Sequence, residues 1–197
     1  MKKLLLLIFI FVFLNSCQQS ELGIPKPRMY PKVEYPDRNS VSFSESYCPI
    51  TFSYPDYFTV GQDKYFFEDK PVNPCWFDLE SVALNSQIHC SYLNVKNRAH
   101  FDKLVGDAFK MAGKHNQKAN YRREQVIDNP EDDVYGLIFE LQGPVASPMQ
   151  FFVTDSTEHF FRASLYFNSK VNPDSIAPVY QYVKDDVIEM IESFKWN

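Results

Sequence analysis

Four strand candidates follow one another in the second half of the chain, and in the second and the fourth of them apolar residues recur at every second position. They span residues 121–128, 134–142, 149–154 and 160–167. Alternation at every second residue is typical of β-strands with one buried face. The connections are short and contain the turn residues Asn129-Pro130, Gly143-Pro144 and Asp155-Ser156. Because short connections join antiparallel neighbours, the pattern predicts a mainly antiparallel sheet.

Two amphipathic helices are predicted around these strands. Asn97 is a good N-cap for the first helix, in which apolar residues recur at helical spacing over 101–112. The second helix closes the chain, with Asp174 or Ser175 as its expected cap and Pro178 in its first turn. Further strands are expected at 50–54, 75–79 and 86–93. This order predicts an α+β fold, a mainly antiparallel sheet covered by two main helices.

The N-terminus has the pattern of a bacterial lipoprotein signal. Two lysines precede an apolar run over residues 4–14, which is too short for a bilayer core that needs about 20 residues. Leu14, Ser16 and Cys17 follow the pattern at which such signals are cleaved. We therefore expect residues 1–16 to be a signal peptide and Cys17 to carry acyl chains. The alternative is an ordinary secretory signal followed by an unrelated cysteine.

Residues 17–46 are rich in proline and have little apolar periodicity. We expect an extended tether that lifts a single domain, residues 47–197, off the membrane. Tyr30 and Tyr35 leave a second interpretation open, in which this segment packs onto the domain or onto a partner. Gln18 stands where an aspartate favours the inner membrane, so we expect the lipid to lie in the outer membrane and the domain to face the periplasm.

Three cysteines remain after Cys17, in a compartment that is oxidising. One disulfide and one free thiol is the simple account of an odd number. Cys48 and Cys75 each stand beside a loop at the start of a predicted strand, so we expect them to pair. Cys90 lies on the apolar face of the strand predicted over 86–93 and is expected to be buried. A catalytic thiol is the alternative, but no flanking motif supports it.

The charge of the chain argues against nucleic acid as a partner. The sequence has 20 basic and 25 acidic residues, a formal net charge of −5. A mildly acidic chain without a visible stripe of lysine or arginine is not expected to bind phosphates. Anionic lipid is not expected to hold it by charge either. The expected attachment to the membrane is the N-terminal lipid itself.

Strong catalytic motifs are absent from the sequence. There is no Walker A, dinucleotide-binding, nucleophile-elbow or zincin motif. Asp155, Ser156 and His159 come nearest to a triad, but they lie within five residues, whereas triad members usually meet across a fold. The four histidines lack the spacing of metal ligands. We expect no cofactor, no metal and no catalysis. A hydrolase that uses Asp155, Ser156 or His159 is the weakest of three hypotheses.

Aromatic residues make up 16% of the chain. Most are expected to fill the core between the sheet and its helices. Tyr65, Phe67 and Trp76 have two interpretations, as core residues or as an exposed contact surface for a partner. Together with Tyr92 they are also candidates for a pocket that binds a small ligand or a cell-wall fragment.

A series of short motifs extends over the mature chain. It comprises Pro25-Lys26-Pro27, Cys48-Pro49-Ile50-Thr51-Phe52-Ser53-Tyr54-Pro55, Cys75-Trp76-Phe77-Asp78-Leu79, Ile88-His89-Cys90-Ser91-Tyr92, Lys114-His115-Asn116-Gln117-Lys118-Ala119, Val134-Tyr135-Gly136, Ala146-Ser147-Pro148-Met149-Gln150-Phe151-Phe152 and Phe160-Phe161-Arg162-Ala163-Ser164-Leu165-Tyr166-Phe167. In this order the motifs resemble the GldD gliding-motility lipoprotein family. The strand at 52–55 and the helix end at 191–194 also resemble those of the Mog1/PsbP-type sandwich.

The resemblance implies a role with the envelope machinery for gliding and type IX protein secretion, and it supplies no catalytic residue. It also favours the Cys48–Cys75 pair. Ser156 and Ser175 follow aspartates, as at O-glycosylation sites of such bacteria. The leading hypothesis is a lipid-anchored, periplasm-facing accessory protein that contacts other gliding and type IX secretion proteins. The alternative is a lipoprotein module that binds a small ligand or the cell wall.

Overall fold

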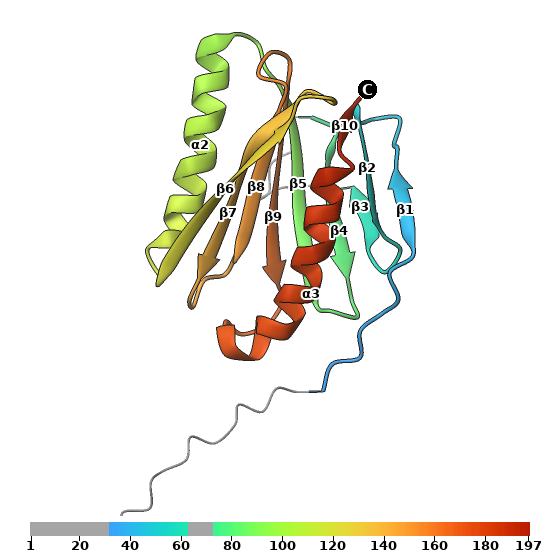
Figure 1. Ribbon diagram of the computed structural model, residues 1–197, viewed down its shortest axis with the longest axis vertical. Coiled ribbons are helices and arrows are strands. Elements are labelled where there is room, and N and C mark those ends of the chain that lie inside the picture. Colours follow the sequence, from blue (N-terminus) through green and yellow to red (C-terminus); the bar gives the residue numbers. More distant parts are fainter. Residues whose placement is uncertain (1–31, 63–72) are drawn as a thin grey trace, which may run out of the picture.

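The computed structural model describes residues 32–62 and 73–197, and its largest element is a seven-stranded antiparallel sheet (Figure 1). The strand order is β3-β4-β5-β9-β8-β7-β6. The strands are β3 (Thr59–Gln62), β4 (Trp76–Ser81), β5 (Ser86–Asn94), β6 (Tyr121–Asn129), β7 (Val134–Gln142), β8 (Met149–Thr154) and β9 (His159–Phe167). All neighbours are antiparallel, as the short connections predict. The β5–β9 pair joins the two halves of the sheet.

Each face of this main sheet is covered by one helix. Helix α2 (Arg98–Asn116) begins after Asn97, whose side chain accepts a hydrogen bond from the backbone N–H of His100 at 2.9 Å. Helix α3 (Pro173–Glu192) is capped in the same way by Asn172. Such caps satisfy a backbone donor in the first turn of a helix. The α+β fold of an antiparallel sheet covered by two helices is therefore confirmed.

A second, smaller sheet lies on the α3 side of the main sheet. In it β2 (Ile50–Pro55) lies between β1 (Ser40–Phe43) and β10 (Lys195–Trp196) and is antiparallel to both. The rings of Phe43 and Phe52 stack with their centroids 4.7 Å apart. The first and last strands of the described chain thus meet on one central strand.

The larger apolar core fills the space between the main sheet, α3 and the smaller sheet. Phe52, Phe77, Phe161 and Phe194 are each at most 2% exposed. Phe161 lies with its centroid 5.1 Å from Phe194 and 6.2 Å from Phe77. Tilted ring pairs of this kind contribute about 0.5–1.5 kcal/mol beyond the burial of their area. The high aromatic content of the chain therefore serves this core.

A smaller core lies between α2 and the other face of the main sheet. Its buried members are Leu104, Ala108 and Ala112 of α2 and Phe139, Phe152 and Phe160 of the sheet. Phe160 and Phe161 are neighbours in β9 and belong to different cores. Because successive strand residues point to opposite faces, α2 and α3 lie on opposite sides of the sheet.

Two local predictions differ from the structure. Strand β1 lies inside the range 17–46, which the sequence predicts as a tether. The strand could not be predicted because Phe43 is its only buried residue, and a single apolar residue gives no periodicity. Helix α3 is capped by Asn172 and not by Asp174 or Ser175, so Pro178 lies inside the helix and not in its first turn. Pro173 explains this start, since its fixed φ suits the first helical position.

Candidate functional site

The N-terminal segment docks on α3 through Tyr35, Pro36 and Arg38. The Nε atom of Arg38 lies 2.7 Å from Oδ1 of Asp186, and its Nη2 donates to the carbonyl oxygen of Tyr182 at 2.7 Å. The guanidinium lies over the Tyr182 ring at 3.8 Å. The Tyr35 ring packs on Tyr182 at 4.6 Å, and the Tyr182 hydroxyl donates to the Pro36 carbonyl. We call these five residues the N-terminal docking site.

Asp186 is the buried group of the N-terminal docking site. Its side chain is 2% exposed, and it also accepts a hydrogen bond from the hydroxyl of Tyr57. Burial raises the pKa of the Asp186 carboxyl, although Tyr57 and Arg38 act in the opposite direction. Burial also raises the pKa of Tyr57, so its hydroxyl remains a donor. Arg38 supplies the charge that a buried carboxylate needs.

This docking corresponds to the second interpretation of the predicted tether. Tyr35, a predicted contact residue, belongs to the N-terminal docking site and still exposes 42% of its surface. Cys17, Tyr30, Tyr65 and Phe67 lie outside the described residues, so their predicted roles stay predictions. The point at which the chain leaves the domain is therefore fixed on α3.

The two described residues of the predicted aromatic pocket lie on opposite faces of the main sheet. Trp76 is opposite Ser91 in the β4–β5 register, whereas Tyr92 is the next residue and points into the larger core. The indole Nε1 of Trp76 donates to the carbonyl of Tyr92 at 3.1 Å. Their side chains therefore do not line one pocket.

A different, apolar cavity of about 230 Å³ lies between the β7–β8 connection, the end of β9 and the start of α3. Its lining includes Leu141, Val145, Pro148, Phe167, Ile176 and Tyr180. Burial raises the pKa of the Tyr180 phenol, which stays neutral. A cavity with this lining suits an apolar ligand. Apolar residues within loops, such as Val145 and Val171, were the feature of the sequence that could have indicated this cavity.

Asp155, Ser156 and His159 form a turn and not a triad. The Asp155 carboxylate accepts backbone hydrogen bonds from Thr157, Glu158 and His159 at 2.8–3.0 Å. Burial opposes the charge of Asp155, but these bonds outweigh it and lower its pKa. The His159 ring lies 2.5 Å from the hydroxyl of Tyr92. Among the described residues, no hydrogen bond joins the Ser156 hydroxyl to the His159 ring.

A polar row that the sequence did not reveal crosses the face of the sheet that α2 covers. Asp78, His89, Ser164 and Gln150 are opposite one another on β4, β5, β9 and β8. Nδ1 of His89 lies 2.6 Å from Oδ1 of Asp78. Ser164 is 4% exposed and Gln150 3%, so the row is largely closed to a substrate. Only the strand register brings these residues together, and the sequence does not specify it.

The candidate metal and glycosylation sites differ in what the structure shows of them. Within residues 32–62 and 73–197, no group of three His, Cys, Asp or Glu side chains could hold a metal ion. The side chains of Ser156 and Ser175 are exposed, one in the turn after β8 and the other in the first turn of α3. Their glycosylation stays a prediction.

The structure contains the predicted disulfide. Cys48 precedes β2 and Cys75 precedes β4, and their sulfur atoms are bonded with the Cα atoms 4.9 Å apart. The bond ties the smaller sheet to the main sheet. Cys90 is a buried free thiol in the larger core. Burial raises its pKa well above the ordinary value, so it is a poor nucleophile.

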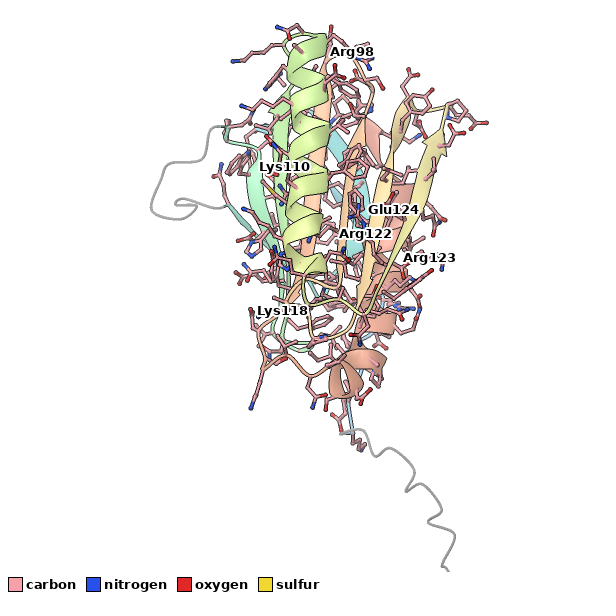
Figure 2. All side chains as sticks on the ribbon, turned by 90° about the vertical axis from the view of Figure 1, so that its left-hand side faces the viewer. Arg98, Lys110, Lys118, Arg122, Arg123 and Glu124 are labelled. Atoms are coloured by element: carbon pink, nitrogen blue, oxygen red, sulfur yellow. A yellow bond between two sulfur atoms is a disulfide. The ribbon has the colours of Figure 1, made fainter. Side chains whose placement is uncertain are left out.

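Positive charge is concentrated on α2 and the start of β6, which Figure 2 shows from the α2 side. Residues 96–123, here called the basic region, contain eight of the twenty basic residues and two of the twenty-five acidic residues of the chain. Within the described residues, Lys103, Lys114, Lys118 and Arg123 have no ion-pair partner. The basic residues are spread over twenty-eight positions, which hides the cluster in the sequence.

Comparisons with known proteins show a structural likeness and a family. The solution structure of cyanobacterial PsbP (CyanoP) from Synechocystis sp. PCC 6803 is similar with a TM-score of 0.49 and 12% sequence identity. The alignment covers 82% of this chain and 95% of that protein. No curated protein matches the sequence. None of the helices among the described residues is long and apolar enough to cross a membrane.

The family match extends over nearly the whole chain. Residues 20–196 match the family described as gliding motility lipoprotein GldD. This range includes both sheets, both helices and the docked N-terminal segment. The chain belongs to the GldD family of gliding motility lipoproteins.

Proposed function

We propose that the protein is anchored in the outer membrane by acyl chains on Cys17, with its domain in the periplasm. There it acts as an accessory component of the gliding motility and type IX secretion apparatus, through protein contacts and without catalysis. The observation that carries this proposal is the family match over residues 20–196, which begins shortly after the predicted signal peptide, residues 1–16, and the predicted lipidation site Cys17.

The N-terminal docking site supports an anchored mode of action. Fourteen residues, 18–31, separate Cys17 from the first described residue, Lys32. Fully extended, they would reach about 50 Å at most. Because Tyr35 and Arg38 dock on α3, the distance from membrane to domain depends on the residues between Cys17 and Tyr35.

The Cys48–Cys75 disulfide supports a location outside the cytoplasm. Stable structural disulfides are typical of oxidising compartments such as the bacterial periplasm. Cys48 and Cys75 are both buried, which shields the bond from reductants. A periplasmic domain on a lipid anchor is consistent with both features.

The proposal is tested by deletion and complementation in the bacterium that produces the protein. We expect deletion to stop gliding and the secretion of type IX cargo, and the wild-type gene to restore both. A Cys17→Ser variant should fold but lack acyl chains, and should fail to restore function. Normal gliding and secretion in the deletion strain would refute the proposal. Full rescue by the Cys17→Ser variant would refute the role of the anchor.

A second candidate function is favoured by the apolar cavity beside α3. Its volume of about 230 Å³ and its lining suit a small apolar molecule or part of an acyl chain. The protein would be purified from its native membrane and its bound molecules extracted and identified by mass spectrometry. Ala177 also lines the cavity, and an Ala177→Phe variant, which adds a ring to its wall, should lose such a molecule. Identical extracts from both proteins would exclude this function.

A further inference from the structure

The first sixteen described residues, 32–47, lie on the outside of the domain and end directly before Cys48 (Figure 1). We call them the N-terminal strap. They follow α3 through the N-terminal docking site and then form β1, the outermost strand of the smaller sheet. Phe43 is the only buried residue of the sixteen, and Val33 and Tyr47 pack partly buried against the larger core. Most of the strap is therefore exposed to solvent.

The contacts of the strap with the domain are concentrated at two places. Near its start, Arg38 pairs with Asp186 in the N-terminal docking site, and the Arg38 side chain is still 38% exposed. Near its end, β1 pairs with β2 over four residues, and the Phe43 ring stacks on Phe52 and Phe77. Segments with few buried apolar contacts and exposed backbone hydrogen bonds open before the rest of a fold. The strap is such a segment.

The Cys48–Cys75 disulfide begins where the strap ends. It connects Cys48 to the residue that precedes β4, and both cysteines are buried. A force on the N-terminus that detaches the strap therefore reaches Cys48 and passes through the covalent bond to Cys75. Residues 49–74, which include β2 and β3, lie within the closed loop and do not carry this force.

Strand β4, which receives the force next, is held more firmly than β1. It pairs with β3 on one side and, over six residues, with β5 on the other. Phe77 and Leu79 of β4 are 0% exposed, and β5 is joined to β9 over nine residues. Because more buried contacts must break, the main sheet resists a force that detaches the strap.

The proposed anchor supplies such a force. Acyl chains on Cys17 hold the N-terminus in the membrane, and a protein partner holds the domain. An increase in their separation first takes up the reach of residues 18–31 and then pulls on Lys32. The strap is therefore the first part of the domain that this force meets.

We propose that the N-terminal strap is a releasable part of the tether, which detaches from α3 and β2 under force, and that the Cys48–Cys75 disulfide stops the release at residue 47. Release of the sixteen residues adds about 55 Å of contour length. This inference rests on the proposed function and deepens it, because it assigns how the reach of the anchored domain is regulated.

Optical tweezers on the mature, full-length lipoprotein in detergent test the release directly. Handles would be attached through clickable amino acids at Ser20, in the tether, and at Lys118, between α2 and β6. Before the domain unfolds, we expect a reversible gain of about 55 Å of contour length, less the distance that the docked strap already spans. A clearly larger or smaller gain, or unfolding without any earlier gain, would overturn the proposal.

An engineered disulfide provides a lock for the strap. The backbone N–H of Asp56 donates to the carbonyl of Asn39 at 2.8 Å, and their side chains are also hydrogen bonded. Opposed residues of this kind have Cα atoms about 5.5 Å apart, which suits a disulfide. In an Asn39→Cys/Asp56→Cys variant the force passes to position 56, beside the buried Phe58, so only residues 32–38 should detach. The gain should fall to about 24 Å, and a gain equal to that of the wild type would refute the assignment of the strap.

Removal of the native disulfide is the converse test. In the Cys48→Ala/Cys75→Ala variant the force continues along the chain into β2, so the release should no longer stop at residue 47. A stop at the same extension as in the wild type would show that the disulfide does not limit the release. Peptide mapping would verify the disulfides of each variant, and melting temperatures would verify that each variant folds.

A matched pair of variants tests the N-terminal docking site. The Asp186→Asn change removes the charge that lies 2.7 Å from Arg38, and we expect the first release at a given force to become about tenfold faster. The Asp185→Asn control removes a neighbouring charge that is 54% exposed and 3.8 Å from Arg38, and should release at the rate of the wild type. Equal rates in the two variants would refute the role of the docking site in holding the strap.

Gliding assays separate this inference from the proposed function. The locked Asn39→Cys/Asp56→Cys variant should restore gliding poorly in the deletion strain. Nine glycine and serine residues inserted after Ser20 should correct this defect, because they replace residues 39–47, which the lock retains. Full restoration by the locked variant, or a defect that the insertion does not correct, would show that the inference is wrong while the proposed function stands. Normal gliding and secretion in the deletion strain would show that the proposed function itself is wrong.

Discussion

Arg38 and Asp186 form the most consequential single contact at the residue scale. The Arg38→Gln change leaves the buried carboxylate without its cation, so we expect the free energy of unfolding at pH 7 to fall by about 1–3 kcal/mol. Burial raises the pKa of Asp186 in the folded protein above its value in the unfolded chain. The folded protein then binds more protons between the two pKa values, so stability falls as pH rises through that interval.

Without Arg38 this interval extends to higher pH, so the loss of stability should grow from pH 4 to pH 7. Urea unfolding at several pH values measures it. In an Asp186→Asn background, the loss of stability caused by the Arg38→Gln change should no longer depend on pH. A loss that is equal at pH 4 and pH 7 would show that the pair does not control stability.

Gly136 is required by the close approach of two strands. A Cβ atom at this position would lie 1.9 Å from the carbonyl oxygen of Phe152 on β8. The Gly136→Ala change should therefore force β7 from β8 and lower stability by about 3 kcal/mol. Gly61→Ala is the control, since a Cβ atom there has nothing within 4 Å. Thermal unfolding of both variants is the measurement, and equal melting temperatures would contradict the argument.

At the scale of elements, the disulfide joins the start of β2 to the start of β4. Its cysteines are 27 residues apart in the sequence. Loss of this constraint in a Cys48→Ala/Cys75→Ala variant should lower the free energy of unfolding by about 3–4 kcal/mol. Denaturant unfolding checks this value. A reductant should lower the stability of a Cys90→Ala variant, as it does that of the wild type, but should not change the stability of the double variant. A double variant as stable as the wild type would refute the prediction.

Elements with many periodic residues could be predicted from the sequence, and short ones could not. Strand β7 has the predicted bounds because apolar residues recur at every second position over its length, and β8 has them because turn residues precede and follow its apolar run. Strand β1 buries one residue and β10 has two residues, so neither contains a detectable period. Both exist because β2 pairs with them, which is a tertiary effect.

The candidate site was predictable only where the local sequence defines it. The positions of Cys48 and Cys75 beside loops, together with the family resemblance, favoured their pairing, and composition predicted the turn at Asp155. The contact of Arg38 with Asp186 could not be predicted, because the two residues lie far apart in the sequence.

At the scale of the whole molecule, the N-terminal docking site sets where the tether begins. Trypsin should cut after Lys32, whose side chain is 88% exposed, before it cuts after Arg38, whose side chain is 38% exposed and bound to Asp186. In an Asp186→Asn variant the cut after Arg38 should become several-fold faster. Mass spectrometry of the early fragments measures both rates. Equal rates after Arg38 in the two proteins would mean that the contact does not hold the segment.

The position of β2 between the first and last strands has a consequence for the order of folding. The hydroxyl of Thr51 bonds the side chain of Asn197, which is 146 residues away in the sequence. Contacts between such distant residues form slowly, because a long loop must close first. Under the proposed export, the N-terminus crosses the membrane first, so β2 can pair with β10 only after residues 195–196 have followed. The smaller sheet would then be completed outside the cytoplasm and late in folding.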